Sequence, residues 1–191
     1  YEKDQVPEDF HSWDIRPVGW SKYFPFRKSM YRNYLLLYPI MIEQMDLRKY
    51  DLVLSSSYLW AKGVLTPSRT LHICYCHTPM RQAWELYFQY KHSYSTAIRK
   101  FVYPFAFNYL RLWDRLASDR VDRYIANSAN VRRRIAKYYR RDSEIIYPPV
   151  ESERYSISDT VEDQYLCLSR LVPYKKTEIA IEAFNKLGSK L

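Results

Sequence analysis

No stretch of this chain is apolar for long enough to cross a lipid bilayer. A membrane-spanning helix needs about 20 apolar residues in succession, whereas the longest apolar-rich run here is the nine residues Tyr34–Ile42. Nothing near the first residue resembles a secretory signal peptide, and there is no internal repeat or low-complexity tract. These absences argue against a membrane-spanning, repetitive or disordered chain, and we expect a globular intracellular protein.

Cysteine is scarce, with three residues in 191. A small, odd number of thiols in an intracellular chain favours free cysteines over a disulfide framework. Cys74, Cys76 and His77 could suggest zinc, but alternate residues of a strand share a face, so the two thiols lie on one face and His77 on the other. No further Cys–His cluster supplies the remaining ligands. We therefore expect no metal site and interpret the two thiols as small core residues.

Negative charge is in deficit. The chain has 30 Lys and Arg against 21 Asp and Glu, which gives a formal net charge of +9. Such a charge suits an anionic partner, which could be nucleic acid, an anionic membrane face or a phosphorylated substrate. The densest basic run is Val131–Arg141, and a solvated helix face would explain it equally well.

Short apolar runs alternate with amphipathic segments along the chain. Nearly continuous apolar strands that alternate with helices are typical of a parallel sheet in an α/β protein, so we predict a Rossmann-like, doubly wound parallel sheet. The predicted strands are Tyr50–Ser57, Leu71–His77, Asp122–Ser128, Ser143–Val150 and Gln164–Leu171. The predicted helices are Arg32–Leu47, Met80–His92, Ala97–Val121 with a kink at Pro104, Asn130–Tyr139 and Lys175–Leu187.

A polar stretch after Pro148 and Pro149 divides the chain. We predict a first domain over residues 1–150, a linker over 151–163 and the start of a second domain over 164–191. A single strand and helix cannot bury their own apolar faces. We therefore expect the remainder of the second domain to lie outside this chain.

Two residues stand where predicted strands end. Ligands of doubly wound sheets bind beyond the carboxyl ends of the strands, so His77 is well placed to touch a ligand, with Pro79 in the first turn of the next helix. The alternative is a structural histidine that is hydrogen-bonded to nearby backbone. Ser128 reads first as a helix N-cap, and the helix N-terminus behind it could also favour an anion in the same crevice.

Two cations surround a predicted strand-to-helix turn. Arg170 follows the last predicted strand, and Lys175 opens the last predicted helix. A lysine at a helix start opposes the helix dipole, which makes sense if a diphosphate accepts charged hydrogen bonds from both side chains. The alternative is a pair of solvated basic residues on a loop.

Six motifs follow one another from Leu71 to the end of the chain: CYCHTPMR, RLWDRLASDRVD, IANS, IYPPV, SRLVPYKK and IEAFNKLG. In this order they resemble the GT-B glycosyltransferases of the large retaining family 4, and most closely the bacterial and archaeal enzymes, many of them labelled mannosyltransferases, that build O-antigen and other surface polysaccharides. The resemblance implies two Rossmann-like domains that face each other across a cleft. The first holds mainly the acceptor, and the second mainly a nucleotide-sugar donor.

The resemblance also implies roles for particular residues. His77 matches the catalytic histidine beside the transferring sugar. Arg170 and Lys175 match the pair that grips the donor diphosphate and stabilises the leaving nucleotide without a metal. Arg81, which closes the first motif, and Ser128 are predicted to line the cleft. No cofactor is expected, and the implied substrates are GDP-mannose or another nucleotide-sugar and a lipid-linked glycan or polysaccharide acceptor.

The chain departs from the family in its lack of glycine, with only three residues. The family's first strand with its glycine-rich loop is not present, and neither is the glutamate pair of the donor domain. We therefore expect this chain alone to be inactive, although its parent is expected to be a glycosyltransferase.

The resemblance favours a cytoplasmic enzyme that attaches peripherally to the inner face of the cell membrane. The basic helix Asn130–Tyr139 and the tyrosines would then contact anionic lipid. A nucleic-acid-binding module is a rival, because cations interleaved with aromatics also suit such a protein. No recognisable DNA or RNA motif accompanies them, so no nucleic-acid partner is expected. A third reading is a scaffold that kept the fold without the chemistry.

Overall fold

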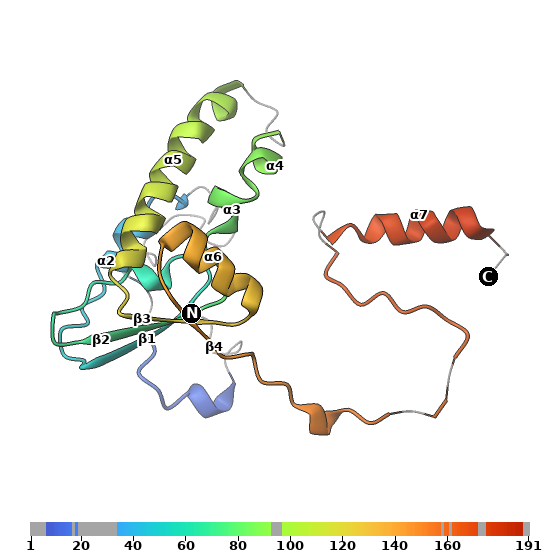
Figure 1. Cartoon of the computed structure of the whole chain (residues 1–191), viewed down its shortest axis with the longest axis horizontal. Coiled ribbons are helices and arrows are strands. Elements are labelled where there is room, and N and C mark those ends of the chain that lie inside the picture. The colour runs from blue at the N-terminus through green and yellow to red at the C-terminus, as the bar shows by residue number, and fades with distance from the viewer. Residues whose placement is uncertain are drawn as a thin grey trace. The chain divides into compact units, whose positions relative to one another are not determined.

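The computed structural model describes residues 7–16, 18, 34–92, 97–157, 159–160, 162–171 and 175–188. The chain divides into two compact units, Tyr1–Pro149 and Val150–Leu191, and each is described by itself (Figure 1). The assignment of the second unit to a donor domain stays a prediction.

The first unit contains a four-stranded parallel sheet with the order β1-β2-β3-β4. This mixed α/β architecture confirms the predicted fold class. The fourth strand is much shorter than Ser143–Val150, because Pro148 and Pro149 have no backbone N–H to donate to a ladder. The strands are β1 (Leu52–Ser57), β2 (Leu71–Cys76), β3 (Arg123–Ala126) and β4 (Glu144–Ile145).

Helices fill the connections between the strands. Both α5 and α6 lie on the same side of the sheet (Figure 1), as expected when right-handed crossovers join strands whose order runs in one direction. The helices of the first unit are α2 (Tyr38–Glu43), α3 (Arg81–Trp84), α4 (Tyr87–His92), α5 (Ala97–Asp119) and α6 (Ala129–Tyr139). Short 3₁₀ turns are η2 (Glu8–Phe10), η5 (Ala61–Gly63) and, in the second unit, η6 (Ser152–Arg154).

Two predicted helices differ from the structure. The helix predicted over Arg32–Leu47 is formed only as α2, which starts where Pro39 fits the first helical turn; residues 32 and 33 lie outside the described residues. The helix predicted over Met80–His92 is divided into α3 and α4. The amides of Glu85 and Leu86 both bond to the carbonyl of Arg81, at 2.9 and 2.8 Å, so the turn widens there.

The face of the sheet toward α5 and α6 is buried. Cys74 and Cys76 of β2 are 0% and 1% exposed and are free thiols, which confirms their interpretation as core residues. Hydrogen bonding to Cys74, together with burial, raises the pKa of the Cys76 thiol. This part of the core consists of Cys74, Cys76, Val121, Tyr124, Ala126, Val131, Ile135 and Tyr139.

The opposite face of the sheet is largely exposed. Leu52 and Leu54 of β1 are 57% and 68% exposed, and Leu71 of β2 is 44% exposed. From the apolar runs in the sequence, we expected strands that are buried on both faces of the sheet. Among the described residues only one face is covered, because the helices of both long crossovers lie on the same side.

A second part of the core lies where α5 packs against η5 and α2. A Cβ atom at Gly63 would overlap the indole ring of Trp113, so this glycine permits the close approach of η5 to α5. The indole N–H of Trp113 donates to Glu43 at 3.0 Å. Arg120 donates to the same carboxylate at 2.6 Å and to the carbonyl of Gly63 at 3.0 Å.

The second unit contains α7 (Thr177–Leu187). The strand predicted over Gln164–Leu171 is not formed, because a single strand has no neighbour with which to pair. Leu166 and Leu168 in this stretch are 86% and 92% exposed. Tyr165 packs against Phe184 of α7, with 5.1 Å between ring centroids.

None of the helices within the described ranges combines the length and the apolar character that a membrane span requires.

The buried His72 of β2 gives the first unit an expected sensitivity to acid. Its Nε2 lies 2.9 Å from the hydroxyl of Ser55, and burial lowers the pKa of His72 below its ordinary value of 6.5, although Asp122 opposes the shift. The unfolded chain therefore binds a proton at a pH where the folded chain does not, so stability is lost as the pH falls below 6.5. We expect His72→Asn to lose less unfolding free energy than the wild type between about pH 7 and about pH 5, measured by urea unfolding.

The control for this prediction is His11→Asn, because His11 lies on the exposed N-terminal part of the described chain. That variant should keep the acid sensitivity of the wild type. An equal loss of stability in the His72 variant and in the wild type would contradict the prediction.

Candidate active site

The carboxyl ends of the strands form one edge of the sheet. Ser57 pairs with Cys76, and Cys76 pairs with Ala126. The amide of His77 continues this ladder with a 2.8 Å bond to the carbonyl of Ser57, and the amide of Ile146 bonds to Ala126 at 3.0 Å. The residue after each strand therefore lies at the edge where ligands of parallel α/β sheets bind.

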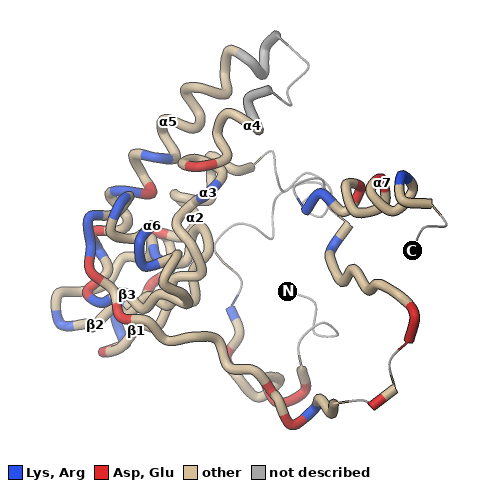
Figure 2. The backbone as a smooth tube through the Cα atoms, turned by 45° about the vertical axis from the view of Figure 1, so that its right-hand side comes forward, with Lys and Arg blue, Asp and Glu red and all other residues tan. Residues whose placement is uncertain are grey.

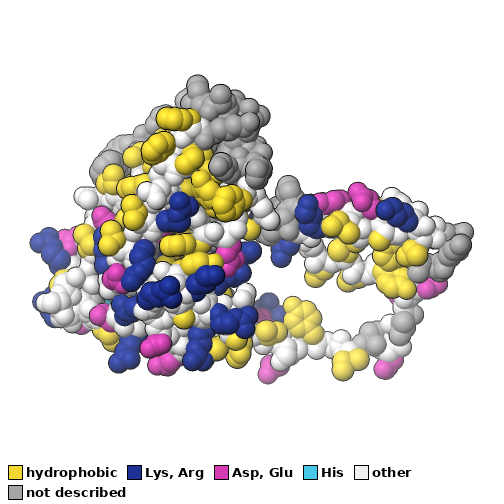
Figure 3. Space-filling model, turned by 45° about the horizontal axis from the view of Figure 1, so that its top comes forward, with side chains coloured by type: hydrophobic (Ala, Val, Ile, Leu, Met, Phe, Trp, Pro, Cys, Tyr) yellow, Lys and Arg dark blue, Asp and Glu magenta, His cyan; other side chains and the backbone are white. Residues whose placement is uncertain are grey.

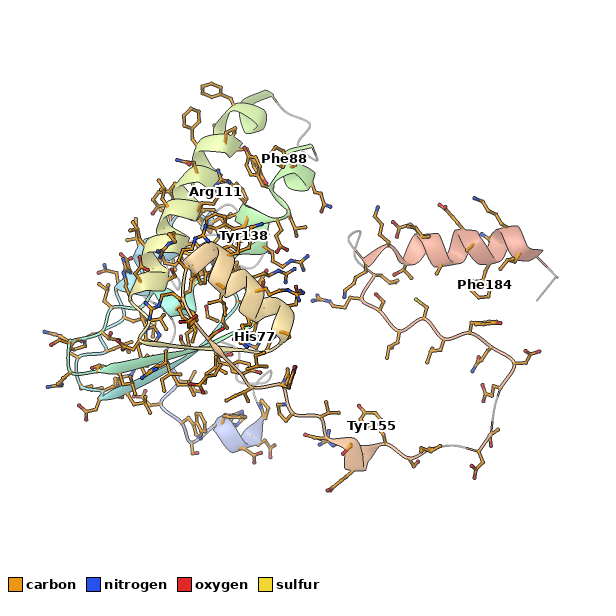
Figure 4. All side chains as sticks on the ribbon, viewed as in Figure 1. His77, Phe88, Arg111, Tyr138, Tyr155 and Phe184 are labelled. Carbon is orange, nitrogen blue, oxygen red and sulfur yellow. The ribbon has the colours of Figure 1, made fainter. Side chains whose placement is uncertain are left out.

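His77 lies at this edge with its imidazole exposed (Figure 4). Its Nε2 is 2.8 Å from the hydroxyl of Ser56, and its ring packs edge-on against Tyr75, with 5.3 Å between centroids. The hydroxyl of Tyr75 donates to the carbonyl of Ile146 at 3.0 Å. The side chain is thus held by a serine hydroxyl and an aromatic ring, and it remains accessible to a ligand.

Ser128 is the N-cap of α6, as predicted. Its hydroxyl accepts a hydrogen bond from the amide of Val131 at 3.2 Å and donates to the amide oxygen of Asn127 at 3.1 Å. The start of α6 therefore follows directly on the carboxyl end of β3. A role for Ser128 in lining a cleft stays a prediction.

Arg81 opens α3, and it is engaged in an ion pair. It lies 3.3 Å from Glu85, whose other oxygen is 2.5 Å from Arg134 of α6. Partial burial would raise the pKa of Glu85, but Arg134 and then Arg81 outweigh it and hold that pKa below its usual range. Tyr138 lies 3.4 Å from the same carboxylate. Arg81 therefore helps to join α3 to α6, and its contact with a substrate stays a prediction.

Trp84 and Tyr138 stack beside this ion pair, with 4.8 Å between ring centroids and 22° between planes. The stack joins α3, which begins four residues after His77, to α6, and Tyr138 is labelled on α6 in Figure 4. Offset aromatic stacking adds about 0.5–1.5 kcal/mol beyond its buried area. The segment after His77 is therefore fixed by both charge and packing.

A buried carboxylate, Asp114 of α5, holds the helices behind the site. It accepts from the ammonium of Lys62 at 2.5 Å, from the indole N–H of Trp84 at 2.8 Å and from the hydroxyl of Tyr139 at 3.1 Å. Lys62 and Asp114 are 2% and 0% exposed. Burial, and then the charge of Asp114, raises the pKa of Tyr139 well above its ordinary value of 10, so this hydroxyl stays a donor.

No pattern in the sequence predicted this cluster. The signal in the sequence was Asp114 itself, which stands four residues after the fully buried Leu110 and three residues before the fully buried Ala117, and therefore at a core position of α5. Its partner Lys62 is 52 residues away in the chain. Only the packed structure could connect the two residues.

Arg170 and Lys175 belong to the second unit, and both are exposed. Within the described residues 162–169, which lead up to Arg170, no strand is formed. Lys175 lies two residues before α7 instead of opening it, because Lys176 takes a left-handed conformation with φ 55° and ψ 33°. The contact of these two cations with a donor diphosphate stays a prediction, and so does their cooperation with His77.

Across the described ranges, no group of three or more His, Cys, Asp or Glu side chains is arranged to hold a metal ion.

A parallel α/β sheet with an accessible histidine at its carboxyl edge is consistent with the Rossmann-like N-terminal half of a GT-B enzyme. The family model described as Glycosyltransferase Family 4 matches residues 3–154 of the 191. The chain therefore belongs to glycosyltransferase family 4. Membership implies a nucleotide-sugar donor and an acceptor in general terms. No curated protein and no solved structure gave a significant match.

Proposed function

We propose that residues 1–150 of this chain form the acceptor-side domain of a retaining, metal-independent glycosyltransferase, and that Arg170 and Lys175 belong to its donor side. The enzyme transfers a hexose, with mannose from GDP-mannose as the first candidate, to a lipid-linked or polysaccharide acceptor in cell-surface glycan synthesis. The observation that carries this proposal is the exposed His77, held by Ser56 at the carboxyl edge of the sheet in a chain that belongs to family 4.

The chemistry assigns different tasks to the two units. During transfer, the bond from the sugar's anomeric carbon to the diphosphate oxygen breaks, and the acceptor hydroxyl oxygen bonds to that carbon while its proton passes to the departing diphosphate oxygen. Negative charge develops on the departing diphosphate, where Arg170 and Lys175 would stabilise it. His77 would form a hydrogen bond with the sugar while the bond between the sugar and the diphosphate breaks. This role requires an imidazole that is both exposed and fixed in orientation.

Attachment to the membrane is part of the proposal. Lys and Arg recur along α6, as Figure 2 shows, and Arg132, Arg133 and Lys137 are exposed there. Anionic lipid on the inner face of a cell membrane attracts such a surface. This surface supports a cytoplasmic enzyme that meets its lipid-linked acceptor at the membrane.

The donor can be tested by thermal unfolding of the native protein with GDP-mannose, UDP-glucose and ADP-glucose in parallel. A donor that binds only the folded state raises the unfolding free energy by about 2.7 kcal/mol at 100 times its Kd. We expect GDP-mannose to give the largest rise and the double variant Arg170→Ala/Lys175→Ala to abolish it.

The matched control is Lys186→Ala, which removes one exposed cation from the last turn of α7 and should leave the rise unchanged. The absence of a rise with every nucleotide-sugar would contradict the proposed function. A rise that survives in the double variant would contradict the roles of Arg170 and Lys175.

A further inference from the structure

The outward side of α5 is apolar over most of its length. The side chains concerned recur at intervals of four, four, three and four residues, which places them on one face of the helix. They are 72%, 67%, 40%, 58% and 62% exposed in chain order. We call this set the outer stripe of α5; it consists of Phe101, Phe105, Tyr109, Leu112 and Leu116.

This arrangement is the reverse of that in an ordinary surface helix. The inner side of α5 already packs into the core through Tyr103, Phe107 and Leu110, so its outer side should carry polar or charged residues. Between residues 101 and 116, the exposed positions outside the stripe are Val102 and Asn108, and Arg115 is partly exposed, with a side chain that is 36% exposed. The outer stripe is therefore not needed for the core that the structure describes, yet it is apolar.

The stripe is large enough to be a contact surface. A phenylalanine presents about 150–250 Å², so Phe101 and Phe105 alone expose roughly 200–350 Å² at their observed fractions. That area by itself reaches the size of the largest apolar patch on a typical monomer. From Phe101 to Leu116 the stripe extends for about 22 Å at the rise of an α-helix.

Cations lie on the same face of the molecule. Figure 3 shows apolar side chains along α5 and a concentration of Lys and Arg beside them over α6. The exposed cations of α6 include Arg132, Arg133 and Lys137, and the whole chain carries a net charge of +9. An occupant of the stripe must therefore offer apolar volume next to negative charge.

We propose that the outer stripe of α5 and the basic surface of α6 together form a membrane-contact surface, in which the stripe enters the interface of an anionic bilayer. A helix that lies in the membrane plane buries such a stripe among the upper acyl chains, while neighbouring Lys and Arg bind the headgroups. The proposal assigns an apolar anchor to the membrane attachment, and it rests on the proposed function only for its biological setting.

A second copy of the chain is a less suitable occupant. Pairing two molecules through their α5 stripes would bring the two basic α6 surfaces close together, and like charges repel. An anionic bilayer instead satisfies both components of the surface. Phe and Tyr are also suited to the boundary between headgroups and acyl chains, where aromatic side chains collect.

The test is flotation of the 191-residue chain with vesicles of phosphatidylcholine, with and without about one-third phosphatidylglycerol. We expect binding to the anionic vesicles that partly survives about 0.5 M salt, because insertion of the stripe is not screened. The double variant Phe105→Ser/Leu112→Ser should partition at least tenfold more weakly and lose all binding in high salt. The control Tyr165→Ser/Leu168→Ser removes a more exposed aromatic–leucine pair from the second unit and should bind like the wild type.

Circular dichroism and light scattering complete the experiment. The stripe variant should keep the helical signal of the wild type, since both positions are exposed. Unchanged partitioning of the stripe variant, or an equal loss in the control, would overturn the proposal. The proposal would also be overturned if the wild type were a dimer in solution and the stripe variant were a monomer that binds vesicles as well as the wild type does. Because no nucleotide-sugar is present, failure here is distinguishable from failure of the proposed function.

Discussion

Replacing Asp114 by alanine is expected to destabilise the first unit by about 3–5 kcal/mol. The substitution leaves the ammonium of Lys62 buried without its carboxylate, at 2% exposure. It also removes the acceptor for the indole of Trp84 and for the hydroxyl of Tyr139. Unpaired buried groups carry their full desolvation cost, which is much larger than the net value of the hydrogen bonds they lose.

The measurement is denaturant unfolding followed by tryptophan fluorescence. Asp119→Ala is the matched control on the same helix: it breaks a largely exposed pair with Arg115 and should cost no more than about 1 kcal/mol. In the double variant Lys62→Met/Asp114→Leu the buried charges are both removed, and a substantial part of the lost stability should return. A loss in Asp114→Ala as small as that in Asp119→Ala would mean that the cluster does not stabilise the fold.

Replacing His77 by alanine is expected to lower the rate of sugar transfer by the native protein by about 10²–10³-fold, the usual effect of losing one group that contacts the transition state. Donor-induced thermal stabilisation should change little, because the donor diphosphate is assigned to Arg170 and Lys175. Turnover is measured with labelled nucleotide-sugar and a membrane extract that supplies the acceptor.

Ser56→Ala tests whether the hydrogen bond to His77 orients the imidazole. Because a single hydrogen bond contributes about 0.5–1.5 kcal/mol, this variant should lose only about 2- to 10-fold in rate. His11→Ala serves as the control for loss of an exposed histidine elsewhere. Full activity in His77→Ala would remove this residue from the catalytic site while leaving family membership untouched.

The local features of the site were predictable because each depends on neighbouring residues. An apolar run, a polar residue and a proline identify the end of β2 and the position of His77. The position of Ser128 between a strand and a helix identifies its role as the N-cap of α6. The parallel sheet followed in the same way from apolar runs separated by helices.

Other features depend on contacts between distant parts of the chain. The break between α3 and α4 occurs at Glu85, which bonds to Arg134 49 residues away, and no periodicity within residues 80–92 predicts it. The apolar pattern of Gln164–Leu171 is that of a strand, but strand pairing also needs a neighbour. One face of the sheet is exposed because the helices between the strands lie on the other side. The strand order decides that side, and local sequence patterns do not give the strand order.

The Asp114 cluster also bears on what kind of small molecule could occupy the edge at His77. A single carboxylate joins η5, α3, α5 and α6, so α3 and α6 cannot slide past each other without separating Trp84 or Tyr139 from it. The cluster therefore restrains the positions of α3 and α6 behind the edge at His77 before any substrate arrives. Rigid inhibitors that fit this edge should therefore bind more tightly than flexible ones, because neither the inhibitor nor the protein then loses much conformational freedom on binding.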